Sequence, residues 1–182
     1  MTLSYLADRR LVVWQAQLSR LSLDAQRSVL AIIETHGFNA AILTAYIISQ
    51  QARAATQASR ALREVMELDT GRTRNIVSPT PSELVDQSRT AAALATILAG
   101  RPEAFRGRTV RMARGEVERV ARDSQTAGMA AAEDIVGWTR RTDSSPCALC
   151  RSLDDGAVLP ADQRMVDHPG CSCIAQPVTT RA

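Results

Sequence analysis

Four cysteines and one histidine lie between residues 147 and 173 of this 182-residue chain. The segment reads Cys147-Ala-Leu-Cys150, then seventeen residues, then His168-Pro-Gly-Cys171-Ser-Cys173. Two donors three positions apart can hold one ion from a tight turn, and a second pair from a distant segment completes the tetrahedron that zinc prefers. Pro169 and Gly170 suit such a ligand-bearing turn. The spacing therefore predicts a zinc site in residues 139–182.

Five donors compete for four positions around a tetrahedral ion, so one donor must be left out. Cys171 lies three residues after His168, as Cys150 lies three residues after Cys147, and is slightly favoured. Cys173 can replace it, because the sulfurs of residues 171 and 173 point to the same side if this segment is extended. The sequence leaves this choice open, and the ligand set is four of Cys147, Cys150, His168, Cys171 and Cys173.

Three thiolates and one imidazole favour a closed, structural zinc site, because a catalytic zinc keeps one coordination position for water. Such a metal can fold a segment without a core of its own, and Val158, Leu159 and Val166 are too few to form one. Two disulfides are the alternative, and they would need an oxidising compartment. No apolar run approaches the roughly 20 residues that cross a bilayer, and the N-terminal residues have no h-region of a signal peptide, so we expect no membrane contact.

The first half of the chain carries apolar residues at helical spacing. One helix is expected from Leu3 to Leu21, and Ser22 is expected to cap a second one that ends at Gly37. Asn39 is placed to cap a longer helix that reaches at least Val65.

Thr80, Pro81 and Glu83 form the clearest helix start in the chain, and this helix is expected to run to about Ala99. A last apolar face runs from Val110 to Trp138, which predicts one helix of nearly thirty residues. It contains Gly115, Gly128 and Gly137, and we expect a kink or a close helix crossing near one of them.

The fold class expected is mainly α: an elongated body of long helices in residues 1–138, followed by a small zinc-stabilised α+β module in residues 139–182. Aromatic residues make up only 3% of the chain, so the helices bury little area per side chain, and partners could contribute to stability. All 22 basic residues are arginine, and each can make a forked contact with carboxylate or phosphate.

Residues 101–114 hold five arginines against one acidic residue. A solvated helix start explains this run more simply than a nucleic-acid contact, because no aromatic residues that could stack on bases are interleaved. The alternative hypothesis is a zinc-containing nucleic-acid-binding protein that uses Arg106, Arg108, Arg111 and Arg114.

The C-terminal segment resembles the C-terminal motif of phage minor head proteins related to the F protein of phage Mu. That motif has an aromatic-x-Arg entry strand, Cys-x-x-Cys, a loop with glycine, His-Pro-x-Cys-x-Cys and a nearby proline. The positions that match are Trp138, Arg140, Cys147, Cys150, Gly156, His168, Pro169, Cys171, Cys173 and Pro177. The match covers less than a quarter of the chain, and the helical body adds nothing to it.

The resemblance implies a structural minor capsid and head morphogenesis protein, present in several copies in the capsid interior near the portal, and in the host cytoplasm during assembly. Its implied partners are the portal and major capsid proteins, and packaged DNA through the arginines named above. Some relatives carry the label capsid maturation protease. We expect no enzyme, because His168 is assigned to zinc and His36, at a predicted helix end, is then the sole histidine for a Ser-His-Asp arrangement.

Overall fold

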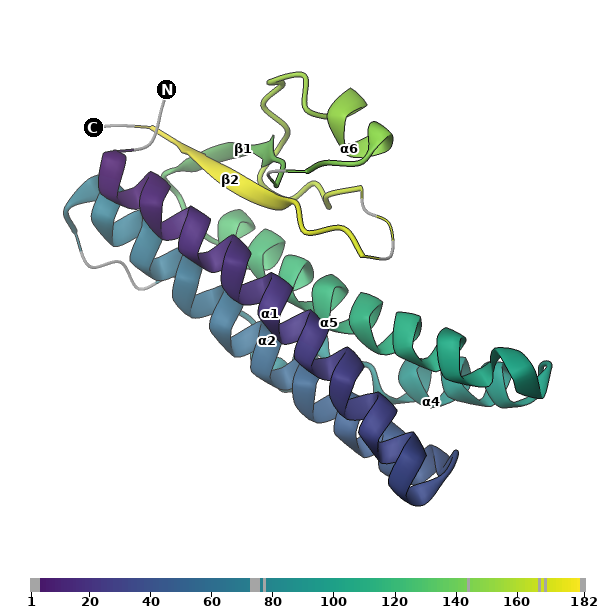
Figure 1. Cartoon of the computed structure of the whole chain (residues 1–182). Coiled ribbons are helices and arrows are strands. Elements are labelled where there is room, and N and C mark those ends of the chain that lie inside the picture. The colour runs from purple at the N-terminus through teal and green to yellow at the C-terminus, as the bar shows by residue number, and fades with distance from the viewer. Residues whose placement is uncertain are drawn as a thin grey trace.

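The computed structural model describes residues 4–72, 76, 78–143, 145–166, 168 and 170–180. Three long helices form an elongated bundle, and a small two-stranded region lies across one side of it, near both chain ends (Figure 1). The elements are α1 (Tyr5–His36), α2 (Ala40–Thr70), α3 (Pro81–Leu84), α4 (Gln87–Leu98), the 3₁₀ turn η1 (Pro102–Ala104), α5 (Phe105–Ala130), β1 (Ile135–Arg141), α6 (Ala148–Ser152) and β2 (Ile174–Thr179). The expected fold class is confirmed: long helices dominate, and the C-terminal α+β region carries the Cys/His cluster.

The first helix is longer than the sequence pattern predicted. Ser4 caps α1 by accepting a hydrogen bond from the backbone of Ala7, and Leu3 lies outside the described residues. The expected break at Ser22 is wrong, because α1 continues to His36 without interruption. Ser22 is fully buried, and its hydroxyl donates to the carbonyl oxygen of Ser19 at 3.0 Å, so it needs no helix start to satisfy its hydrogen bond.

The turn between α1 and α2 follows the sequence signals. Gly37 ends α1 with a positive φ of 65°, which favours glycine, and the side chain of Asn39 accepts from the backbone of Ile42 at 3.1 Å. Beside this turn Phe38 meets Phe105 edge to face, with ring centroids 5.4 Å apart. The start of α5 is thereby fixed to the α1–α2 turn.

The capping box at Thr80 is present, but the helix that it begins has only four residues. The backbone then becomes extended at Val85, and Asp86 caps a new helix by accepting from the backbone of Arg89 at 2.8 Å. The prediction of one continuous helix from Pro81 to about Ala99 is therefore wrong. The cap at Asp86 starts a new helix and competes with continuation of the first one.

The expected helix through Trp138 is also too long. α5 ends at Ala130, and Ile135 and Trp138 belong to β1, which pairs antiparallel with β2. The β-branched and aromatic residues of this segment suit a strand. Ile135 and Trp138 also fit the helical spacing of the preceding apolar residues, which is why the sequence pattern extended the helix. The division into a helical body (1–138) and a C-terminal module (139–182) stays a prediction, and β1 spans the boundary between them.

The bundle core lies where α1, α2 and α5 meet. Small residues let the helices approach closely, and Ala54, Ala58 and Ala121 are at most 1% exposed. Gly128 of α5 lies at such a crossing, because a Cβ built there would stand 2.7 Å from Leu62 Cδ2 of α2. The expected close helix crossing thus occurs at Gly128, whereas a Cβ at Gly115 would meet nothing within 4 Å.

The two-stranded region shares its core with the helices. One hydrophobic cluster combines residues of α2, α5 and β1 with three cysteines: Leu62, Met66, Ile76, Met129, Ile135, Trp138, Cys150, Met165, Cys171, Cys173 and Ala175. Ile174 of β2 packs in the bundle core itself. As expected from composition, the region has no separate core, and Val158 and Val166 are more than half exposed.

The chain ends meet at one corner of the bundle. The carboxylate of Asp69, near the end of α2, accepts a hydrogen bond from the backbone N–H of Ser4 at 2.7 Å and another from the Thr179 hydroxyl at 2.9 Å. One side chain therefore links the start of α1 to the end of β2. None of the helices among the described residues is long and apolar enough to span a membrane.

The helix crossing gives a stability prediction. Gly128→Leu should lower the free energy of unfolding by about 1–3 kcal/mol, because the added side chain overpacks the contact with Leu62. Gly115→Leu is the matched control on the same helix, and it should keep or raise stability because a helix favours leucine over glycine. Urea unfolding followed by circular dichroism measures both changes, and equal effects at the two positions would contradict the crossing.

Candidate metal centre

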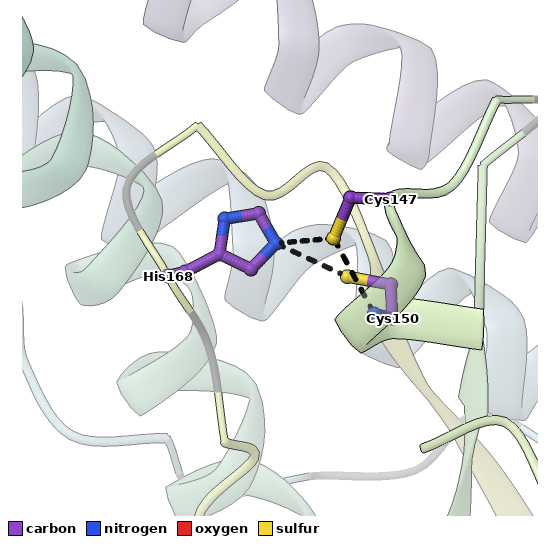
Figure 2. Close-up of side chains that lie close together, drawn as sticks. All are labelled: Cys147, Cys150 and His168. Carbon is purple, nitrogen blue, oxygen red and sulfur yellow. Dashed lines mark hydrogen bonds between the residues drawn. The ribbon is translucent and has the colours of Figure 1, made fainter. Parts of the chain in front are cut away.

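The first two cysteines lie at the start of the short helix α6. Cys147 is its N-cap, and its sulfur accepts a hydrogen bond from the backbone of Cys150 at 3.4 Å. The His168 ring points at both sulfurs, with Nε2 3.0 Å from Cys147 Sγ and 3.3 Å from Cys150 Sγ (Figure 2). A one-turn helix and a distant loop thus present three donors to one point.

The other two cysteines approach Cys150 from the side of β2. Cys171 Sγ lies 3.6 Å from Cys150 Sγ, and the sulfurs of Cys150, Cys171 and Cys173 all lie within 4.8 Å of one another. The donors of Cys147, Cys150 and His168 form a second such group. Cys150 belongs to both groups and is the centre of the cluster.

The donor set and its spacing fit a metal ion. Zinc binds sulfur at about 2.3 Å and nitrogen at about 2.0 Å in a tetrahedron, so neighbouring ligand atoms lie roughly 3.5–4 Å apart. The Cys150–Cys171 distance of 3.6 Å falls in that range, and the distances of 3.0 and 3.3 Å from His168 Nε2 to the two sulfurs are shorter. All five predicted ligand residues are brought together, and the cluster could hold a metal ion such as zinc. Pro169 lies outside the described residues.

A hydrogen bond couples the thiols of Cys171 and Cys173. A hydrogen bond from the Cys173 thiol, with support from the charge of Arg122, lowers the pKa of Cys171 to about 5. The same hydrogen bond, together with burial, raises the pKa of Cys173. The backbone N–H of Cys150 lowers the pKa of Cys147, and burial raises that of Cys150 to about 11. In the metal-free chain this hydrogen bond favours the thiolate at Cys171, and the preference for Cys171 over Cys173 as a ligand stays a prediction.

Three charged residues of α5 anchor the ligand-bearing turn. Arg114 donates to the carbonyl oxygen of Gly170 at 3.0 Å, and Glu118 accepts from the backbone N–H of Gly170 at 3.1 Å. Arg122 donates to the carbonyl oxygens of Cys171 and Cys173. These residues stand one helical turn apart, so they form a single stripe facing the turn.

The anchoring stripe is buried, which makes its hydrogen bonds costly to break. Glu118 is 1% exposed and Arg122 is 3% exposed. Burial raises the pKa of Glu118 although Arg114 and Arg122 oppose this rise. The sequence analysis missed Glu118 and Arg122. The alternation of charge at every fourth position, from Arg114 through Glu118 to Arg122, is the signal that could have found them.

Contacts from α1 and the loops complete the support of the turn. Gln15 of α1 donates to the carbonyl oxygen of Ser172 at 3.0 Å, and the Ser172 hydroxyl donates to the carboxylate of Asp143. The cysteine-bearing segment 171–173 is therefore held from both long helices that it crosses. Its geometry does not depend on the metal alone.

The aromatic-x-Arg strand holds the loop that leads to His168. Trp138 exchanges two backbone hydrogen bonds of 2.8 Å with Leu159, and its indole donates to the carbonyl oxygen of Gln163 at 2.9 Å. Arg140 donates to the carbonyl oxygen of Val166 at 2.5 Å. A Cβ at Gly137 would stand 2.3 Å from the carbonyl oxygen of Leu159, so only glycine permits this close approach. Gly156 takes a positive φ of 76° in the same loop.

The four arginines proposed for nucleic acid serve different contacts. Arg106 pairs with Glu34 of α1 at 2.5 Å, and Arg114 pairs with Glu118 at 2.9 Å. Arg111 is exposed, and Arg108 approaches Gly100. His36 lies exposed at the C-terminal end of α1. The end of α1 is the end of the bundle away from the two-stranded region (Figure 1).

Single cysteine variants should separate the ligands. Cys150→Ser should reduce bound zinc to near zero, because its sulfur belongs to both donor groups. Cys171→Ser should lose most zinc, and Cys173→Ser should keep most of it. Elemental analysis of zinc per chain after gel filtration measures these contents, with Ser152→Ala on α6 as the control. Retention of zinc by Cys171→Ser and its loss from Cys173→Ser would reverse the assignment, and a zinc-free wild type would refute the site.

The anchoring stripe should tune metal affinity without touching the metal. Arg122→Met should weaken zinc binding about 10–100-fold, because it releases the carbonyl oxygens of Cys171 and Cys173. Arg53→Met, an exposed position on α2, is the matched control. Competition with a chromophoric chelator measures the affinities, and equal affinity of the two variants would contradict the role of Arg122.

The geometry therefore supports one coarse chemical statement: a Cys/His cluster capable of holding a metal ion lies against the side of a bundle of long helices. Comparisons of the chain with protein families, with curated proteins and with solved structures found no match. Any more specific function has to be argued from the residues themselves.

Proposed function

We propose that this chain is a structural minor capsid protein of a phage head, similar to the Mu F-like minor head proteins. In this proposal one zinc ion stabilises the C-terminal region, and the helical body docks on other head proteins such as the portal. The observation that carries the proposal is the joint arrangement of the motif residues. The flanking Trp138 and Arg140 hold the same loop that brings His168 to the cysteines.

The donor chemistry supports a structural use of the metal. The cluster offers four sulfurs and one imidazole, which is more than a tetrahedral ion needs, so no coordination position is reserved for water. Cys150, Cys171 and Cys173 are buried in the hydrophobic cluster shared with α2 and α5. A metal in this place would fix the C-terminal region rigidly to the bundle.

The surface supports an assembly role. Large apolar side chains of α1 are exposed, including Tyr5 at 72% and Leu6 at 56%. Val136 of β1 and Val158 of the following loop are also about half exposed. Exposed apolar groups mark a partner surface where they form one contiguous patch, which is what the assembly role requires of these residues.

The test is incorporation into particles. Heads purified from cells that produce the encoding phage should contain the chain in a few copies, as measured by quantitative mass spectrometry. Cys150→Ser should be incorporated at least several-fold less than Ser152→Ala, because loss of the metal loosens the C-terminal region. Heads that lack the chain while it remains free in the cytosol would contradict the proposal. Loss of capsid-protein processing in His36→Ala, with folding intact, would favour the protease instead.

A further inference from the structure

A cavity of about 320 Å³ lies beside the metal-capable cluster, between α4, α5 and the loop that carries His168. No cysteine lines it, but His168 does, so the cavity adjoins the candidate metal ligands. Its wall contains guanidinium groups from three separate parts of the chain: Arg89, Arg111, Arg119, Arg122 and Arg164. The cavity size is at the lower end of the range of small-ligand sites.

Positive charge dominates this cavity. Glu116 and Glu118 are the carboxylates in its wall, so five arginines face two acidic groups. Glu116 accepts from Arg89 at 3.1 Å and from Arg119 at 2.8 Å, and Asp123 just outside the wall pairs with Arg164 at 3.1 Å. These ion pairs orient the guanidinium groups but leave a cationic excess.

Arg111 and Gly115 leave part of the cavity open to a ligand. Arg111 forms no ion pair among the described residues, and its Nη1 atom lies 3.5 Å from the position of a Cβ at Gly107, one turn before it on α5. One turn further along α5, a Cβ at Gly115 would meet nothing within 4 Å. Arg111 thus lines the cavity with an exposed side chain, and open space lies one turn further along α5 at Gly115.

We propose that this cavity binds a phosphate group carrying two negative charges. Guanidinium forks match the oxygen geometry of both carboxylate and phosphate. A carboxylate offers two oxygens and one charge, which one arginine can satisfy. A phosphate dianion offers three or more acceptor oxygens and compensates more of the excess charge, so it engages several of these arginines at once. The ligand is free phosphate or a phosphate monoester, such as the phosphorylated end of a polynucleotide.

The first test is calorimetric titration of the metal-loaded chain with inorganic phosphate, against chloride at the same ionic strength. Phosphate should bind with one site and raise the melting temperature, whereas chloride should do neither. Arg111→Gln should weaken phosphate binding about tenfold, because a charge-assisted hydrogen bond is lost. Arg53→Gln on α2 should bind as the wild type does. The zinc content is measured after each titration, so that removal of metal by phosphate is not mistaken for binding.

The second test fills the cavity. Gly115→Ala should retain phosphate binding, and Gly115→Leu should abolish it, because only the larger side chain occupies the open space. Both substitutions favour the helix, and circular dichroism of each variant checks that it is folded before binding is compared. If Gly115→Leu does not fold, Arg111→Gln decides the question. Absence of phosphate binding to the wild type, or binding that survives both Gly115→Leu and Arg111→Gln, would overturn the proposal.

The source of the phosphate is decided with oligothymidylate, with and without a 5′-phosphate. Tighter binding of the phosphorylated oligonucleotide than of inorganic phosphate, lost in Gly115→Leu, identifies a polynucleotide end as the ligand. If inorganic phosphate binds as tightly as the phosphorylated oligonucleotide, the ligand is the free ion. Binding of both oligonucleotides alike and insensitivity to Gly115→Leu would place the contact elsewhere and contradict the proposal.

Discussion

The hydrogen bonds from Arg122 to the carbonyl oxygens of Cys171 and Cys173 join the helical bundle to the Cys/His cluster. Arg122 is buried in α5, the helix that packs on both α1 and α2. A buried guanidinium must keep its partners, because an unpaired charge in this place would cost several kcal/mol. The bundle therefore positions the turn that carries the donors. Arg114 and Glu118 also hold this turn, through hydrogen bonds to the backbone of Gly170.

The local features of this fold could be predicted from the sequence. Gly37 ends α1 because glycine readily adopts the positive φ found there, and Asn39 begins α2 because its side chain accepts a hydrogen bond from a nearby backbone N–H. Both effects are local. The cysteine and histidine spacing likewise identified all five members of the cluster, since metal donors restrict the possible arrangements strongly. The hydrogen bond between Cys171 and Cys173 could not be read from their spacing, and the choice between these two donors stays a prediction.

Features that depend on distant residues could not be predicted in the same way. Ile135 and Trp138 fit a helical period, and only pairing with β2 about 40 residues later makes them a strand. Ser22 has the side chain of a cap, but its burial against other helices keeps α1 continuous. Glu118 and Arg122 read as solvent-exposed helix charges until the turn at Gly170 is placed over them. Functional roles beyond metal binding stay predictions.

The corner at Asp69 sets how the molecule can be tethered. Because Ser4 and Thr179 are bonded to the same carboxylate, any segment joined to either described end leaves the bundle from one place. The opposite end, where Phe38 meets Phe105 and Glu34 meets Arg106, carries no chain terminus (Figure 1). A chain anchored at its corner would thus project this end outward by the full length of α1, roughly 48 Å at 1.5 Å per residue over 32 residues. The bundle would then act as a rigid spacer, with the Cys/His cluster held against its flank.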